Sequence, residues 1–126
     1  MNIHTKTKIF IGLLSIWGLF LFWSCNSQEA QTWLYIEPTQ CLSNTWDQEW
    51  LQTHDYNEYP QNEAAQLKIV TDYYRDHGVV IHDIYTRKVY EAVCAACSCP
   101  TGDRIYSLVQ EQDVDFMLAE GWLRPS

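Results

Sequence analysis

The chain has 126 residues, of which 47% are hydrophobic and 19% are charged, and its formal net charge is −8. One domain with one modest core fits this length. Because 8 Lys and Arg stand against 16 Asp and Glu, the chain lacks the basic patch that phosphate binding requires, and nucleic acid is excluded as a partner.

The N-terminus has the pattern of an export signal. Lys6 and Lys8 precede an uncharged apolar run over residues 9–23, and Ser24 and Cys25 follow it. A basic start, an apolar run of this length and a small residue at the break are typical of a secretory signal. The run is short for a transmembrane helix, which takes roughly 20 apolar residues. An uncleaved signal anchor is the main alternative interpretation, and simple secretion is a third.

The sequence Ser-Cys-Asn-Ser at residues 24–27 resembles the lipobox of bacterial lipoproteins. This resemblance implies a signal peptide over residues 1–24, a lipidated Cys25 with a short spacer over 25–31, and one domain over 32–126. It also implies a protein in the bacterial cell envelope, outside the cytoplasm and at the outer rather than the inner membrane. The lipid anchor would be its contact with the membrane, because the acidic domain has little attraction for anionic lipid.

The remainder of the chain alternates strand and helix patterns in the order β-α-β-β-α. We expect strands over residues 32–36, 79–86 and 104–110, a long helix over 63–77, and a short helix over 113–120. Asn62 caps the long helix, and Gly78 provides its left-handed stop. A further helical turn is expected near Thr45 and Gln48, which have capping-box spacing. Arg87 and Lys88 are expected to turn the chain.

This order predicts an α+β fold. A right-handed crossover from the first strand through the long helix to the second strand leaves a slot between them. The third strand fills that slot and gives a three-stranded antiparallel sheet, a truncated form of the ferredoxin-like split β-α-β arrangement. The alternative is a plain antiparallel three-stranded sheet with both helices on one face.

Four cysteines remain once Cys25 is assigned to lipid, and an even number in a small exported domain indicates disulfides. The predicted topology brings the end of the first strand beside the start of the third, so we predict the pairs Cys41–Cys99 and Cys94–Cys97. The segment Cys-x-x-Cys-x-Cys-Pro-x-Gly resembles that of small exported lipoproteins of unassigned role. That resemblance implies location and cysteine use but no activity.

A metal site is the alternative use of the same cysteines. Thiolates of Cys94, Cys97 and Cys99, with Cys41 or a histidine as the fourth ligand, would suit Zn(II) or Cu(I). Such thiolates must stay reduced, which an oxidising compartment disfavours. A redox-active pair of Cys94 and Cys97 is a third interpretation. The disulfide interpretation is preferred, and we expect no cofactor.

The predicted function is binding rather than catalysis, because the sequence has no pair of acids placed for proton transfer and no nucleophile motif. Two segments are candidate binding elements: the loop over residues 97–103, stiffened by a proline, and the aromatic stretch over residues 46–60. The candidate contact residues are Pro100, Thr101, Asp103, Trp46 and Trp50. We expect a protein partner, and inhibition of a protease is one form that such binding could take.

Overall fold

The computed structural model describes residues 28–91 and 94–126. Its elements follow in the order β1 (Gln31–Ile36), α1 (Thr45–Trp50), η1 (Tyr56–Glu58), α2 (Glu63–Asp76), β2 (Asp83–Lys88), β3 (Asp103–Gln110), η2 (Glu111–Asp113) and α3 (Val114–Ala119). The expected α+β class is therefore confirmed. The predicted signal peptide and Cys25 lie outside the described residues. Within the described ranges, no helix is long and apolar enough to cross a membrane.

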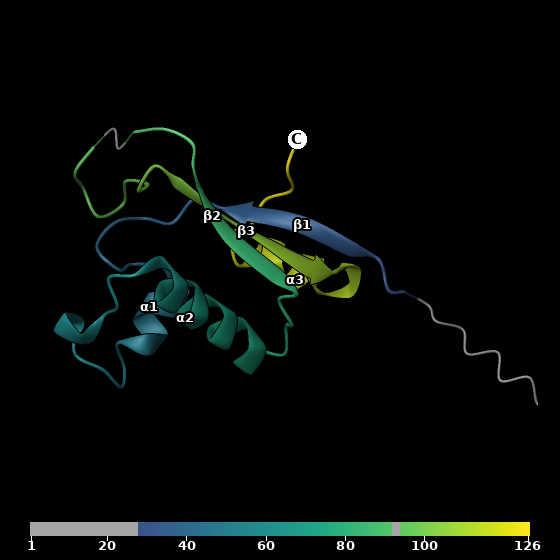
Figure 1. The fold of residues 1–126 in the computed structure, drawn as a ribbon, viewed down its shortest axis with the longest axis horizontal. Coiled ribbons are helices and arrows are strands. Elements are labelled where there is room, and N and C mark those ends of the chain that lie inside the picture. The colour runs from purple at the N-terminus through teal and green to yellow at the C-terminus, as the bar shows by residue number, and fades with distance from the viewer. Residues whose placement is uncertain (1–27, 92–93) are drawn as a thin grey trace, which may run out of the picture.

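The three strands form one open sheet in the order β1-β3-β2, and β3 is antiparallel to both neighbours (Figure 1). This is the predicted arrangement, in which the third strand lies between the first two. The α1 and α2 helices lie on one side of the sheet. At the outer edge of β1, Tyr35 and Leu123 form an isolated antiparallel bridge. Within the described part of the chain, this bridge is all that occupies the position of a fourth strand.

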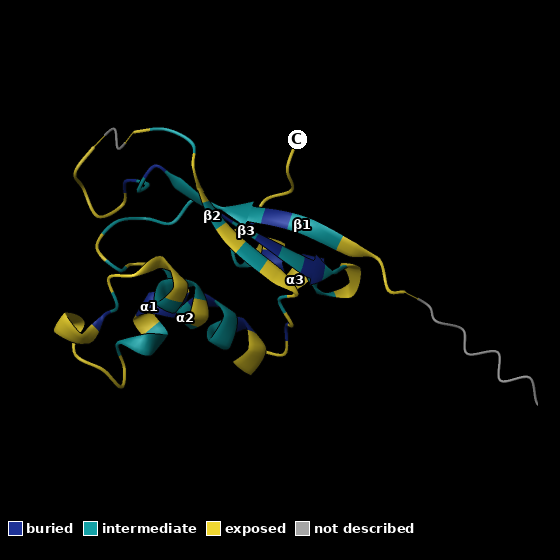
Figure 2. Ribbon diagram, in the orientation of Figure 1, coloured by how far each residue is buried: buried dark blue, intermediate teal, exposed yellow. Residues whose placement is uncertain are grey.

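The core lies between the sheet and the helices (Figure 2). Alternate residues of β3 are buried, so one face of the strand is directed toward the core. The side chains that are almost fully buried in this core are Leu34, Val70, Tyr74, Val109, Val114, Met117 and Trp122. The indole N–H of Trp122 donates a hydrogen bond to the hydroxyl of Tyr74 at 2.7 Å. This bond fixes the C-terminal segment against α2.

The second strand begins later than predicted. Gly78 ends α2 with φ +85°, as expected, and the next residues carry the chain from the helix to the sheet. Val79 is only 2% exposed because it fills the core during this crossing, and Ile81 packs against the core, whereas Val80 is 56% exposed. Val79 and Ile81 therefore serve burial rather than strand pairing. The expected turn at Arg87 and Lys88 is also wrong. Both residues belong to β2 and pair with the first residues of β3.

Candidate functional site

The four cysteines of the described residues form two disulfides, Cys41–Cys97 and Cys94–Cys99, with Cα–Cα distances of 5.0 and 5.9 Å. The predicted disulfide framework is present, but the predicted pairing of Cys41 with Cys99 and of Cys94 with Cys97 is wrong. The backbone N–H of Gln40 donates to the carbonyl oxygen of Cys99 at 2.9 Å, so residue 99 lies opposite residue 40. The chain turns at Cys41, whose φ is +62°, and again over residues 96–99, where the N–H of Cys99 donates to the carbonyl oxygen of Ala96 at 2.9 Å. These two turns place Cys97, rather than Cys99, beside Cys41.

The disulfides hold residues 94–101, the stapled loop, beside residues 38–44. Thr39 forms an isolated antiparallel bridge with Pro100, and the N–H of Thr101 donates to the carbonyl oxygen of Pro38 at 3.0 Å. The pairing of β1 with β3 thus continues past the ends of both strands. The stapled loop is fixed by covalent bonds and backbone hydrogen bonds together.

The alternative interpretation, a metal site, requires cysteine thiolates, and the structure has the cysteines in their oxidised, disulfide form. All four sulfurs are in disulfides, so none is a thiolate that could bind Zn(II) or Cu(I). Among the described residues, no group of three or more His, Cys, Asp or Glu is placed to hold a metal ion. His54 is stacked on Trp50 and His77 lies at the end of α2, so neither joins the cysteines.

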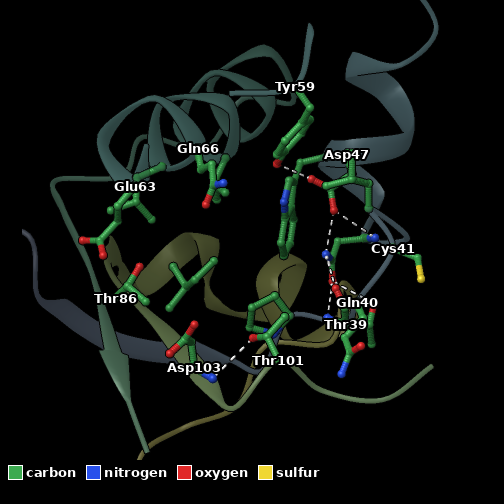
Figure 3. A pocket seen from close by; sticks show the side chains of 17 residues that line it. Thr39, Gln40, Cys41, Asp47, Tyr59, Glu63, Gln66, Thr86, Thr101 and Asp103 are labelled. Atoms are coloured by element: carbon green, nitrogen blue, oxygen red, sulfur yellow. Dashed lines mark hydrogen bonds between the residues drawn. The ribbon is translucent and has the colours of Figure 1, made fainter. Parts of the chain in front are cut away.

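A pocket of about 210 Å³ lies between the segment 38–44, α1, the start of α2 and the start of β3, and Thr101 is the residue of the stapled loop that lines it (Figure 3). Trp46, Thr101 and Asp103 all line it, so the two candidate binding segments meet at one site. Pro100, which is bridged to Thr39, is not among the residues that line this pocket. Trp50 lines a different hollow of about 490 Å³ between α1 and α2. The pocket therefore combines three of the five predicted contact residues.

The pocket has an apolar lining on its core side. Leu67, Val70 and Ile105 line it, and the indole of Trp46, 3% exposed, is both a core residue and part of the wall. Trp46 therefore belongs to the core and to the pocket wall at the same time. A ligand group entering the pocket would rest on side chains already held in place by the core.

A buried carboxylate closes one side of the pocket. Asp47 is 1% exposed and accepts hydrogen bonds from the Tyr59 hydroxyl at 2.5 Å and from the Asn44 side-chain amide at 2.6 Å (Figure 3). The backbone N–H of Asn44 also donates to Asp47, at 3.2 Å, so α1 is capped by Asn44 rather than by the predicted Thr45. Burial, followed by the hydrogen bond to Asp47, raises the pKa of Tyr59 far above its usual value.

This network ties three segments together. Asn44 also accepts a hydrogen bond from the backbone N–H of Thr39 at 2.9 Å, which connects α1 to the segment beside the stapled loop. Tyr59 connects the same network to the chain entering α2. Because each polar group has partners, Asp47 and Asn44 are structural members of the wall, and the groups left to meet a ligand lie at the pocket's rim.

The rim is negatively charged. Glu63, at the start of α2, is exposed, and Asp103, at the start of β3, is half-buried. Of the described residues that line the pocket, none is a lysine, arginine or histidine. Lys88 is the cross-strand neighbour of Asp103, but its ion pair, at 3.9 Å, is with Glu91. The pocket thus joins an apolar floor to a rim of carboxylates.

Sequence reasoning identified Trp46, Thr101 and Asp103 but missed Asp47 and Glu63. One signal was present: Asn44 and Asp47 have the spacing of a capping box, which predicts that these two residues bond to each other. Nothing in the spacing placed Glu63 near Asp103. The chain matches no protein-family model, and comparisons with curated proteins and solved structures gave no match.

Proposed function

We propose that the protein is a lipid-anchored, non-enzymatic binding module whose pocket receives a side chain of a protein partner. The observation that carries this proposal is the pocket itself, where the stapled loop and Trp46 meet. Binding sites are typically concave and largely apolar, with a few polar groups that fix orientation. An apolar floor with Glu63 and Asp103 at the rim has this composition.

Rigidity of the stapled loop supports the proposal. Two disulfides and the bridge between Thr39 and Pro100 restrict the loop before any partner arrives. A preorganised surface loses less conformational entropy on binding, so a larger share of the contact energy appears as affinity. Inhibition of a protease by this loop is one form of the proposed function.

The charge at the rim selects the kind of side chain. Glu63 and Asp103 have no cation beside them in the pocket, so a lysine or arginine of the partner would pair with them while its aliphatic stem lies on the apolar floor. Electrostatic complementarity of this kind affects specificity and the rate of association. The partner is therefore expected to present a basic side chain from a protruding segment.

Capture from native membrane fractions tests the site. The double variant Thr101→Arg, Asp103→Lys should lose the partner, because it fills the rim and reverses its charge. A matched variant with the same two changes in charge, Gln112→Arg and Asp115→Lys, alters exposed residues on η2 and α3 and should retain it. Far-UV circular dichroism establishes that both variants fold. Equal capture by both folded variants would remove the pocket from the proposal.

A photo-reactive residue at the rim gives an independent test. Glu63→p-benzoylphenylalanine should cross-link the partner, and the same substitution at the exposed Asp115 should not. The milder variant Glu63→Gln, Asp103→Asn should weaken capture and reduce its sensitivity to salt, because ion pairing at an exposed rim is screened. Unchanged salt sensitivity would contradict recognition of a basic side chain.

The anchor forms a separate part of the proposal, supported by the lipobox-like residues 24–27. Cys25→Ala should abolish incorporation of labelled fatty acid and leave an unprocessed precursor in the membrane. Ser27→Ala, two residues further on, is the matched control and should be processed normally. Equal labelling of the Cys25→Ala protein would show that lipid is attached elsewhere or that the signal is of another kind.

A further inference from the structure

The sheet has an aromatic face on the side opposite the core. Because side chains alternate along a strand, the residues between the buried positions of β1 and β3 point away from the helices. We call this surface the aromatic face, and it consists of Trp33, Tyr35, Glu37, Asp83, Tyr85, Arg87, Arg104, Tyr106 and Leu108. None of its members belongs to the core cluster or packs against it. It is separate from the pocket.

Tyrosines form the centre of this face. Tyr35 and Tyr85 are both register partners of Tyr106, so one row of three rings crosses the whole sheet. The rings of Tyr85 and Tyr106 are stacked with centroids 5.0 Å apart, and those of Tyr35 and Tyr106 are 5.8 Å apart. The ring centroids of Trp33 and Tyr85 are 5.4 Å apart in a T-shaped arrangement. These contacts hold the rings in fixed positions, and Tyr85 remains 42% exposed.

The charged side of the face carries an unpaired cation. Arg87 lies directly opposite Arg104 in the register, and like charges in that position repel. Arg104 is neutralised by Glu37, whose carboxylate accepts its Nε–H at 2.9 Å. Of the lysines and arginines in residues 28–91 and 94–126, Arg87 alone has no ion pair. An anionic group placed over Arg87 would relieve the repulsion.

Single-stranded nucleic acid fits this face poorly. It stacks its bases on aromatic rings but also needs a cation for each backbone phosphate, and of the two arginines of this face only Arg87 has no ion pair. A protein is the competing occupant, because Tyr, Trp and Arg are enriched in protein interfaces, so a polyglutamate peptide is tested beside the sugars.

A sugar ring can contact both the aromatic rings and the charged residues of this face. Its C–H groups lie against the negative face of an aromatic ring, and its hydroxyl groups bond to planar carboxylate and guanidinium groups. We infer that the aromatic face binds a carboxylated polysaccharide, with sugar rings stacked on Tyr85 and Tyr106 and a sugar carboxylate paired with Arg87. Arg is suited to this pairing because its guanidinium can bond a carboxylate through two parallel N–H groups.

The test uses the full-length protein, purified from membranes in a detergent without a sugar headgroup. Oligogalacturonate and oligomannuronate are titrated by calorimetry beside their methyl esters, which keep the rings and remove the charge. At least one acidic oligosaccharide should bind saturably and at least about fivefold more tightly than its ester. Absence of saturable binding by both acids would overturn the inference, as would equal binding by a polyglutamate peptide.

Four variants separate the contribution of the aromatic rings to binding affinity from the contribution of the Arg87 charge. Tyr85→Ala should weaken binding about tenfold, whereas Tyr85→Phe keeps the ring and should bind within about twofold of the original protein. Arg87→Gln should remove the preference for the acid over the ester, and Arg87→Lys should retain part of it.

Controls for these variants lie on other faces of the protein. Tyr56→Ala removes the exposed tyrosine of η1, and Arg75→Gln removes an exposed arginine of α2, and both should bind normally. Unaltered binding by Tyr85→Ala or an unaltered preference in Arg87→Gln would place the ligand away from the aromatic face. Because the face does not include the pocket, loss of partner capture at the pocket leaves this result unaffected.

Discussion

The two ends of the domain are held together by different means. At the packed end, α2, α3 and the C-terminal segment bury Tyr74, Met117 and Trp122 almost completely. At the stapled end, the residues of segments 38–44 and 94–101 are exposed or half-buried except for Cys99, and the segments are joined by disulfides and backbone hydrogen bonds. A chain of this size has too little apolar surface to bury both ends, so covalent bonds replace packing where the stapled loop reaches the solvent.

The largest expected effect lies at the packed end. Trp122→Ala should destabilise the protein by about 4–5 kcal/mol, because it leaves a cavity and removes the hydrogen-bond donor to the buried Tyr74 hydroxyl. Urea unfolding followed by far-UV circular dichroism measures the loss. Trp50→Ala, at a half-buried position, is the control and should cost less. A loss below that of Trp50→Ala would mean that the packed end is not the main source of stability.

The next largest effect separates the two disulfides. Replacing Cys41 and Cys97 with serine should destabilise by about 4 kcal/mol in the chain-entropy model, because this disulfide spans 56 residues. Replacing Cys94 and Cys99, which are 5 residues apart, should destabilise by about 2 kcal/mol in the same model. Peptide mapping under non-reducing conditions identifies the pairs. Recovery of a Cys94–Cys97 peptide would contradict the observed pairing.

A smaller loss of stability is expected for substitutions of Gly78, which ends α2 before the chain crosses to β2. Its φ is +85°, and a Cβ added there would meet nothing within 4 Å. Gly78→Val should therefore cost about 1–2 kcal/mol through backbone strain alone. Gly78→Asn should cost less, since Asn tolerates positive φ. Equal stability of the two variants would show that α2 can end in another conformation.

The smallest effect is a dependence on pH where β1 meets the stapled end. The hydrogen bond from Arg104 holds the pKa of the Glu37 carboxyl below its usual value. A carboxyl with a lowered pKa in the folded state adds stability above its unfolded pKa, and this stability is lost as the pH falls through the folded value. NMR titration of Glu37 should show the lowered pKa, and Arg104→Gln should return it toward normal. An unchanged pKa in that variant would refute the assigned cause.

Much of the architecture could be predicted from local patterns. The long helix followed from Asn62, its apolar stripe and Gly78, and the placement of β3 between its neighbours followed from the right-handed crossover. These features could be predicted because each depends on residues close in sequence or on a rule of chain connection. The start of β2 could not be predicted, because an apolar run has the same sequence pattern whether its residues fill a core or pair in a strand.

The sequence by itself determined the acidic charge, the disulfide chemistry, the order of the elements and three residues of the pocket. The tertiary structure decided which cysteines pair, because the bridge between Thr39 and Pro100 brings two turns together, one at Cys41 and one over residues 96–99, and these turns place Cys97 beside Cys41. It also decided that Glu63 lies at the same rim as Asp103. The tertiary structure also decided the aromatic face. Tyr35, Tyr85 and Tyr106 form one row only when three strands that are distant in sequence align, and the sequence pattern of each strand alone does not predict their register.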